Sequence, residues 1–135
     1  MSENPMESEN LGVGVEELDR QHRILLDLTH EMVRAAEGHR EGTVVEALFS
    51  GMLAYAAEHF RTEEEMMRQA GFPDLEKHQA HHGVLLTKAR DFHERFRQGN
   101  VDAAGFGLFF VGWVVLHIRN EDRQYTDCLH SAGIQ

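Results

Sequence analysis

The sequence predicts an all-α protein, an antiparallel up-down-up-down four-helix bundle that carries a metal centre in its core. Apolar residues recur at intervals of three and four along four separate stretches, which is the period of amphipathic helices. Short connections join these stretches and favour antiparallel neighbours. Histidines or carboxylates interrupt the apolar stripe of every stretch, where hydrocarbon is normally found. The length of 135 residues suits one domain with its own core.

The first helix is expected over residues 16–37. Its inward stripe consists of Leu18, His22, Leu25, Thr29, Met32 and Ala36. A polar connection bracketed by Gly38 and Gly42 follows this helix. Thr43, with Glu46 three residues later, forms a candidate capping box that would satisfy free amides at a helix start. The second helix is therefore expected to begin there and to reach about residue 69.

The second helix and the third are separated by a clear break. The stripe of the second helix consists of Leu48, Met52, Tyr55, His59, Glu63 and Met66. Residues 70–73, Ala-Gly-Phe-Pro, end it, because glycine closes helix ends and proline cannot continue a helix. Asp74 is in position to cap the third helix, which is expected to reach about residue 97. The stripe of the third helix consists of Leu75, His78, His82, Leu85, Ala89, Phe92 and Phe96.

The fourth helix follows a Gln-Gly-Asn turn at residues 98–100, can be capped by Asp102, and is expected to end near residue 128. Its stripe carries Phe106, Phe110, Trp113 and His117. Residues 103–116 carry no charge, but a membrane span needs about 20 such residues, so we predict a buried core helix. Gly105, Gly107 and Gly112 either weaken this helix or allow close helix packing, and the sequence leaves both open.

The polar residues on the inner stripes predict a metal centre. They are His22, His59, Glu63, His78, His82 and His117. Burying such groups without partners is costly, and metal binding offsets that cost. His59 with Glu63, and His78 with His82, are spaced four residues apart and so share a helix face. Imidazole suits iron, copper, nickel or zinc, carboxylate can bridge two ions, and the set exceeds the four ligands of a structural zinc site. The count therefore favours two metals that share carboxylates.

Two neighbouring carboxylates, Glu121 and Asp122, are candidates for the seventh ligand. Glu121 lies four residues after His117 and would share its face in a regular helix. Asp122 lies about 140° off that face and would need a local π-type widening of the helix, which occurs at functional sites. His81 is the rival of His82 on the third helix. Because the apolar stripe passes through His82, His81 is expected to face outward.

The composition narrows the range of partners and compartments. The formal net charge of −10 argues against nucleic acid and anionic membranes as partners. The single cysteine, Cys128, permits no internal disulfide and indicates a reducing, cytoplasmic compartment. Residues 1–13 are expected to form a flexible arm without the features of a secretory signal, ahead of a domain over residues 14–135. Tyr125 and Cys128 are expected to pack at the bundle end without a functional role.

Four segments together resemble the hemerythrin family, in particular its bacterial single-domain members. They are residues 18–22 (Leu-Asp-Arg-Gln-His), 59–64 (His-Phe-Arg-Thr-Glu-Glu), 72–82 (Phe-Pro-Asp-Leu-Glu-Lys-His-Gln-Ala-His-His) and 113–122 (Trp-Val-Val-Leu-His-Ile-Arg-Asn-Glu-Asp). A full ligand set in this order is far more specific than any one pair. One departure is that bacterial members often carry a tryptophan ahead of the first helix, where this chain has Asn-Leu-Gly-Val-Gly at residues 10–14.

The resemblance implies a non-haem di-iron centre that binds dioxygen reversibly, with its two iron ions bridged by carboxylates and by an oxo or hydroxo group. By position, one iron would be held by His78, His82 and His117, the other by His22 and His59, and both by the bridging Glu63 and Asp122. The resemblance thus selects Asp122 as the seventh ligand. It also implies one open position on the iron that has two histidines.

Apolar residues beside the ligand positions are expected to form the dioxygen pocket. They are Leu25, Phe60, Trp113, Val114 and Ile118. A dry pocket admits dioxygen, excludes anions and offers no acid–base side chain for cleavage of the O–O bond. The family often has a larger aliphatic residue at the position of Val114. We therefore expect this valine to widen the path to the metal and to speed autoxidation.

The resemblance implies oxygen storage, transport or delivery rather than enzymatic catalysis, in a monomer that passes dioxygen to an oxygen-consuming enzyme. The alternatives are oxygen or redox sensing through a separate partner, detoxification of peroxide or nitric oxide, and iron handling. The histidine-rich set favours dioxygen binding, because di-iron enzymes that activate oxygen resemble one another in carboxylate-rich sites with Glu-x-x-His pairs. Neither nucleic-acid binding nor membrane insertion is expected.

Overall fold

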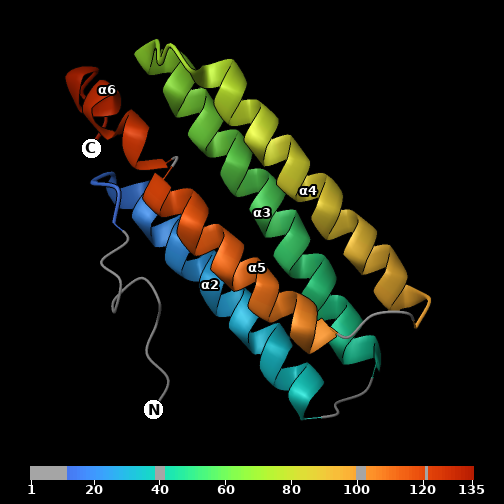
Figure 1. Ribbon diagram of the computed structural model, residues 1–135. Helices are drawn as coiled ribbons and strands as arrows, with labels where there is room; N and C mark the ends of the chain where they lie inside the picture. Colours follow the sequence, from blue (N-terminus) through green and yellow to red (C-terminus); the bar gives the residue numbers. More distant parts are fainter. Residues whose placement is uncertain (1–11, 39–41, 100–102, 121) are drawn as a thin grey trace.

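Four long helices build the body of the protein in the computed structural model, which describes residues 12–38, 42–99, 103–120 and 122–135 (Figure 1). They are α2 (Glu16–Glu37), α3 (Gly42–Ala70), α4 (Leu75–Arg97) and α5 (Ala103–Asn120), followed by the 3-10 turn η1 (Asp122–Tyr125) and the short helix α6 (Thr126–Ser131). Successive long helices run in opposite directions, which confirms the predicted antiparallel bundle. Most of the predicted arm, residues 1–11, lies outside the described residues.

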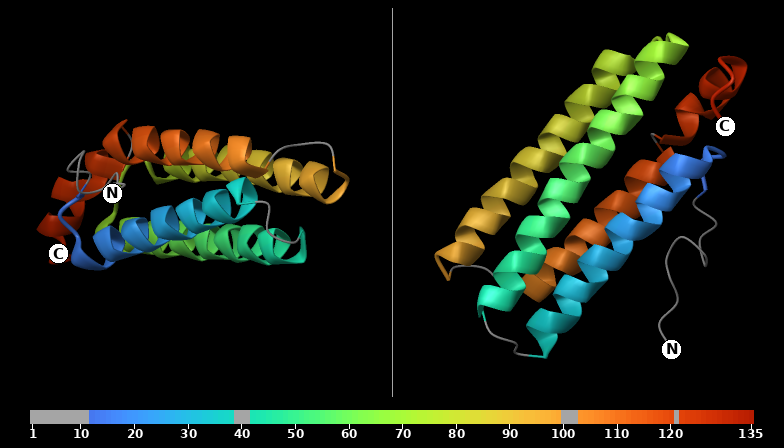
Figure 2. Two further views of the ribbon diagram at one scale, coloured as in Figure 1. Left: turned by 90° about the horizontal axis from the view of Figure 1, so that it is seen from below. Right: turned by 180° about the vertical axis from the view of Figure 1, so that it is seen from behind.

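The metal-ligand candidates all belong to one end of this bundle. Figure 2 shows α6 beside the start of α2, at the end where α3 finishes and α4 begins. Two hydrogen bonds fasten this end: Thr126 donates to the carbonyl of Val13 at 2.6 Å, and the ring of His130 contacts the carbonyl of Gly14 at 2.7 Å. None of the helices in the described part of the chain could span a membrane.

The helix boundaries follow local chemistry, with two corrections. Gly71 has a φ of +70°, and the amide of Phe72 bonds the carbonyl of Met67 at 2.9 Å, as in a glycine-terminated helix end. Thr43 lies inside α3 and the carboxylate of Glu46 contacts His93 at 2.9 Å, so the predicted capping box is wrong. Asp74 precedes α4 as predicted, but its side chain makes no capping hydrogen bond.

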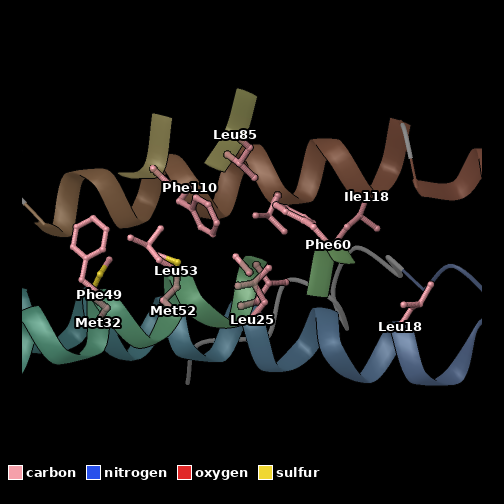
Figure 3. Close-up of a cluster of buried hydrophobic side chains, with 14 of the residues drawn as sticks. Leu18, Leu25, Met32, Phe49, Met52, Leu53, Phe60, Leu85, Phe110 and Ile118 are labelled. Atoms are coloured by element: carbon pink, nitrogen blue, oxygen red, sulfur yellow. The ribbon is translucent and has the colours of Figure 1, made fainter. Parts of the chain in front are cut away.

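The apolar interior is continuous along the bundle. Figure 3 shows it extending from Leu18 at one end to Met32 and Phe49 at the other. On α3 the buried set is wider than predicted, because this helix packs against both α2 and α4. The predicted stripe members Leu48, Tyr55 and Met66 are only half-buried, whereas the core positions are Val45, Phe49, Met52, Leu53, Ala56, His59, Phe60, Glu63 and Met67.

The fourth helix differs most from its prediction. It ends at Asn120 rather than near residue 128, and the chain continues as η1 and α6. It is also not buried all round, since the large apolar side chains of Leu108, Phe109 and Leu116 are 61%, 51% and 55% exposed. Gly107 allows close helix packing, one of the two roles left open for the glycines of this helix. A Cβ there would lie 2.2 Å from Val33, so its lack of a side chain lets α5 approach α2.

Candidate metal centre

The seven side chains implied by the resemblance meet inside the bundle. They come from α2 (His22), α3 (His59 and Glu63), α4 (His78 and His82), α5 (His117) and η1 (Asp122). Each is at most 5% exposed. Spacing explains the pairs: residues four apart on a helix lie on one face, and that face of α3 and of α4 turns inward. Convergence from five elements makes one cluster of residues that are distant in sequence.

Three histidines gather around one oxygen of Asp122 and one of Glu63. The Oδ1 atom of Asp122 lies 2.9 Å from Nε2 of His78 and 3.0 Å from Nε2 of His117. The Nε2 atom of His82 lies 3.1 Å from that of His117 and 3.4 Å from Oε1 of Glu63. Ligand atoms of all five residues lie within 4.8 Å of one another, close enough to surround one cation.

A second group contains two histidines and shares the same carboxylates. The Nε2 atom of His59 lies 3.2 Å from Oε1 of Glu63, and that of His22 lies 3.4 Å from Oε2 of Glu63. The ligand atoms of these three residues also lie within 4.8 Å of one another. Asp122 reaches this group through Oδ2, which is 3.3 Å from Nε2 of His22. Each carboxylate therefore touches both histidine groups, which is the arrangement of a bridge.

The cluster lacks the hydrogen bonds that a buried polar group normally has. Among the described residues, the buried side-chain atoms without a hydrogen-bond partner are Nδ1 and Nε2 of His22, Oε1 of Glu63, Nε2 of His78 and both oxygens of Asp122. All but Nδ1 of His22 belong to the close contacts given above. Such atoms are costly to bury unpaired, and a cation satisfies their lone pairs. The residues thus fit a pair of metal ions.

The charges of the cluster balance internally. Burial alone would raise the pKa of Glu63, but facing His59, His22 and His82 outweigh it and hold that pKa well below its usual value. Burial likewise disfavours a charged His22, yet Asp122 and Glu63 raise its pKa to about 9. Carboxylates also raise the pKa of His82 to about 9 against its burial. Without a metal, protons on these histidines offset the buried carboxylates, and a metal ion has to displace them.

Asp122 reaches the cluster by a route that the sequence did not suggest. In the structure α5 ends at Asn120 and Asp122 begins the tighter turn η1, so Asp122 reaches the cluster without the π-type widening that a continuing helix would have needed. Glu121, which regular helical spacing favoured, lies outside the described residues. His81 lies outside both groups, half-buried beside Trp113, Leu116 and Asn120 in a surface depression of about 170 Å³.

Three further residues touch the cluster and were missed as functional residues. The phenol of Tyr125, fully buried, donates to Oε2 of Glu63 at 2.6 Å, which corrects the expectation that this tyrosine only packs at the bundle end. Gln21 contacts Nδ1 of His59, and Glu64 contacts Nδ1 of His82. Sequence adjacency gave no signal for these contacts, because Gln21 and Glu64 each contact a histidine of another helix.

A narrow apolar cavity adjoins the second histidine group. It is lined by Leu25, Phe60, Trp113, Val114 and Ile118, together with His22, His59, His117 and Asp122. It has no room for a water molecule. The ring of Phe60 stacks on His82 with centroids 3.9 Å apart, and Trp113 stacks on His117 at 4.9 Å. The structure therefore places all five predicted pocket residues around one dry space beside the cluster.

The fold and this cluster define a class: an antiparallel helical bundle with buried histidines and shared carboxylates able to hold two cations. The sequence model described as "Hemerythrin HHE cation binding domain" matches residues 13–129, and this chain belongs to the hemerythrin family. That family binds dioxygen at a di-iron centre, in agreement with the predicted cofactor.

Individual relatives agree in sequence and in structure. The chain is 31% identical over 122 residues to a bacteriohemerythrin of Methylococcus capsulatus, covering 87% of this chain and 90% of that protein. It is 26% identical over 119 residues to a bacteriohemerythrin of Stenotrophomonas maltophilia, covering 88% and 77%. A crystal structure of wild-type hemerythrin matches with a TM-score of 0.84 at 25% identity, covering 96% of this chain and 97% of that one.

Proposed function

We propose that this chain binds dioxygen reversibly at a di-iron centre. The ligands are His78, His82 and His117 for one iron, His22 and His59 for the other, and Glu63 and Asp122 as bridges. The geometry given above supports this division, because each carboxylate lies within 3.4 Å of histidines from both groups. Bound iron would supply the electrons that hold dioxygen. The protein supplies the ligand geometry and the surroundings.

The observation that carries the proposal is the dry cavity beside the two-histidine group. Both histidines of the two-histidine group line it, whereas His117 is the one lining histidine from the three-histidine group. An iron held by His22 and His59 would have one histidine fewer than its neighbour, so it could accept a small ligand from the cavity side. Apolar walls from Leu25, Phe60 and Ile118 disfavour water and anions, which need hydrogen bonds, whereas apolar dioxygen needs none and would enter as these side chains move apart. The pocket thus suits dioxygen.

The cavity walls also favour binding over catalysis. Its polar lining residues are His22, His59, His117 and Asp122, all of them assigned as ligands. No other acid–base side chain among the described residues lines it, so no free proton donor is placed to promote cleavage of the O–O bond. The phenol of Tyr125 is engaged in a hydrogen bond that it donates to Glu63. We therefore propose a non-enzymatic role in oxygen storage, transport or delivery.

Iron content and dioxygen uptake test this proposal together. The chain is loaded anaerobically with ferrous iron. We then measure iron per chain, and the dioxygen per iron pair that is taken up in air and released again on deoxygenation. We expect two irons and one dioxygen for each chain. His78→Ala should lose iron, whereas the matched control His81→Ala, three residues away and outside the cluster, should keep it. Equal iron content in both variants, or fewer than two irons in the parent chain, would contradict the proposal.

A further inference from the structure

The two halves of the proposed centre differ in the group that contacts Nδ1 of a histidine, the ring nitrogen that points away from the cluster. Nδ1 of His82 lies 2.7 Å from Oε2 of Glu64, a carboxylate. Nδ1 of His59 lies 2.8 Å from Oε1 of Gln21, a neutral amide. In both cases Nε2 of the same ring faces the cluster. Each contact therefore sits directly behind a proposed ligand, on opposite halves of the centre.

The amide of Gln21 has a fixed orientation. Its Nε2 donates to Oε1 of Glu17 at 3.0 Å, so its carbonyl oxygen must be the atom that faces His59. An oxygen only accepts, hence Nδ1 of His59 carries the proton and Nε2 keeps its lone pair for a metal. Glu17 is itself held by Arg20, and this side-chain contact lowers the pKa of the Glu17 carboxyl to about 2. The ion pair of Arg20 and Glu17 thus holds the amide of Gln21, and this neutral amide orients the ring of His59.

Glu64 fixes the tautomer of His82 in the same way but adds a charge. A carboxylate accepts the Nδ1 proton, and Gln79 holds its other oxygen at 3.3 Å. The side chain of Glu64 is 20% exposed, so its charge is only partly screened by water. A carboxylate behind a ligating histidine raises the basicity of the ring, whereas an amide orients the ring without adding charge.

We propose that Glu64 is a positioning residue that makes the three-histidine iron the more easily oxidised of the pair, because the neutral amide of Gln21 gives the two-histidine iron no such charge. This inference rests on the proposed function. One electron passes from the three-histidine iron to an added one-electron oxidant, the Nδ1 proton stays in the bond to Glu64, and no ligand bond breaks. The negative charge of Glu64 stabilises the added positive charge on that iron. The iron beside the dioxygen cavity is thereby the later one to be oxidised.

Potentiometric titration of the iron-loaded protein under nitrogen tests this. Glu64→Gln keeps the size of the side chain and one oxygen that can accept from Nδ1 of His82, but it removes the charge and the oxygen that accepts from Gln79. We expect its first oxidation potential to shift upward and its iron affinity to fall about 10- to 100-fold. Glu65→Gln is the matched control, because it removes one charge from the neighbouring exposed position of α3, where Glu65 pairs with Arg68. Its potential should stay at the parent value.

Gln21→Glu is an independent second test, because it places a carboxylate against Nδ1 of His59, a proposed ligand of the two-histidine iron. It should shift the second oxidation potential downward. Mössbauer spectra of the half-oxidised parent should assign the ferric ion to the iron whose parameters change in Glu64→Gln. Potentials unchanged in both variants, or equal shifts in Glu64→Gln and Glu65→Gln, would overturn this inference. A parent chain that binds two irons and dioxygen while showing that result would leave the proposed function standing, whereas a parent without two irons would overturn both.

Discussion

The phenolic oxygen of Tyr125 lies 2.6 Å from Oε2 of Glu63, and both side chains are fully buried. The two residues are 62 positions apart in sequence, on η1 and α3. Through this bond the C-terminal turn that carries Asp122 is tied to the other shared carboxylate. The position of both bridging candidates therefore depends on the chain folding back after α5.

Replacing Tyr125 with phenylalanine tests that tie. The change leaves Oε2 of Glu63 without its donor while keeping the ring, so we expect a loss of about 1–3 kcal/mol in the free energy of unfolding. Urea unfolding of the metal-free protein measures it. Iron release to a chelator should also be faster in this variant. A stability and release rate equal to those of the parent would show that the hydrogen bond contributes little.

Metal uptake should release protons. In the metal-free cluster the pKa values of His22 and His82 are raised to about 9 by the neighbouring carboxylates, so both rings are protonated at pH 7. Both must lose a proton to bind a metal, and we expect release of about two protons per chain. Calorimetry with zinc in buffers of different ionisation enthalpy counts them. Affinity should rise from pH 7 to about pH 9 and then level off, and a pH-independent affinity would contradict the charge balance.

The same shifts predict how the metal-free fold responds to pH. The folded pKa values of His22 and His82 exceed the ordinary value of 6.5. Their contribution to stability is therefore complete below about pH 6.5 and is lost as the pH rises through about 9.

Two glycines of α5 should respond to alanine in opposite directions. A Cβ on Gly107 would meet Val33 at 2.2 Å, so Gly107→Ala should destabilise the protein by about 1–3 kcal/mol. Gly112 is exposed, and nothing lies within 4 Å of a Cβ added there. Gly112→Ala should stabilise it by about 0.5–1 kcal/mol through lower chain entropy in the unfolded state. Thermal unfolding of both variants measures the two effects. A Gly107→Ala variant as stable as the parent, or more stable, would refute the close approach of α5 to α2.

Val114 should control how fast the reduced centre is lost to oxidation. This residue is 3% exposed and lines the dry cavity. Leucine would add one methylene to a space that has no room for water, which narrows the path to the cluster. We expect Val114→Leu to autoxidise more slowly than the parent in stopped-flow measurements. An autoxidation rate equal to that of the parent would show that the small size of Val114 does not speed autoxidation.

The sequence predicted the long helices well because their apolar period is regular. The first helix has the predicted bounds, Glu16–Glu37, and the break after Ala70 falls where glycine and proline require it. Reasoning from a regular helical period failed at the end of α5. Regular spacing from His117 favoured Glu121, but Asp122 enters the cluster because the helix stops and a tighter turn follows. A break in periodicity of this kind leaves no apolar pattern to detect.

The residues behind the histidines were beyond pattern reasoning for a different reason. Gln21 and Glu64 are each adjacent to a ligand candidate, and neighbours on a helix point about 100° apart. Each acts on a histidine of another helix: Gln21 of α2 on His59 of α3, and Glu64 of α3 on His82 of α4. Such contacts depend on how two helices are rotated against each other, which the period of one helix does not specify.

An absorption spectrum recorded through cycles of oxygenation tests the central claim most directly. The iron-loaded, anaerobically reduced chain is exposed to air and then returned to nitrogen, with iron counted per chain. Reversible binding in the dry cavity predicts charge-transfer bands that appear in air, vanish on deoxygenation and return with little loss over successive cycles. Direct conversion to a stable diferric spectrum, with no reversible bands, would contradict reversible binding and favour redox sensing or detoxification.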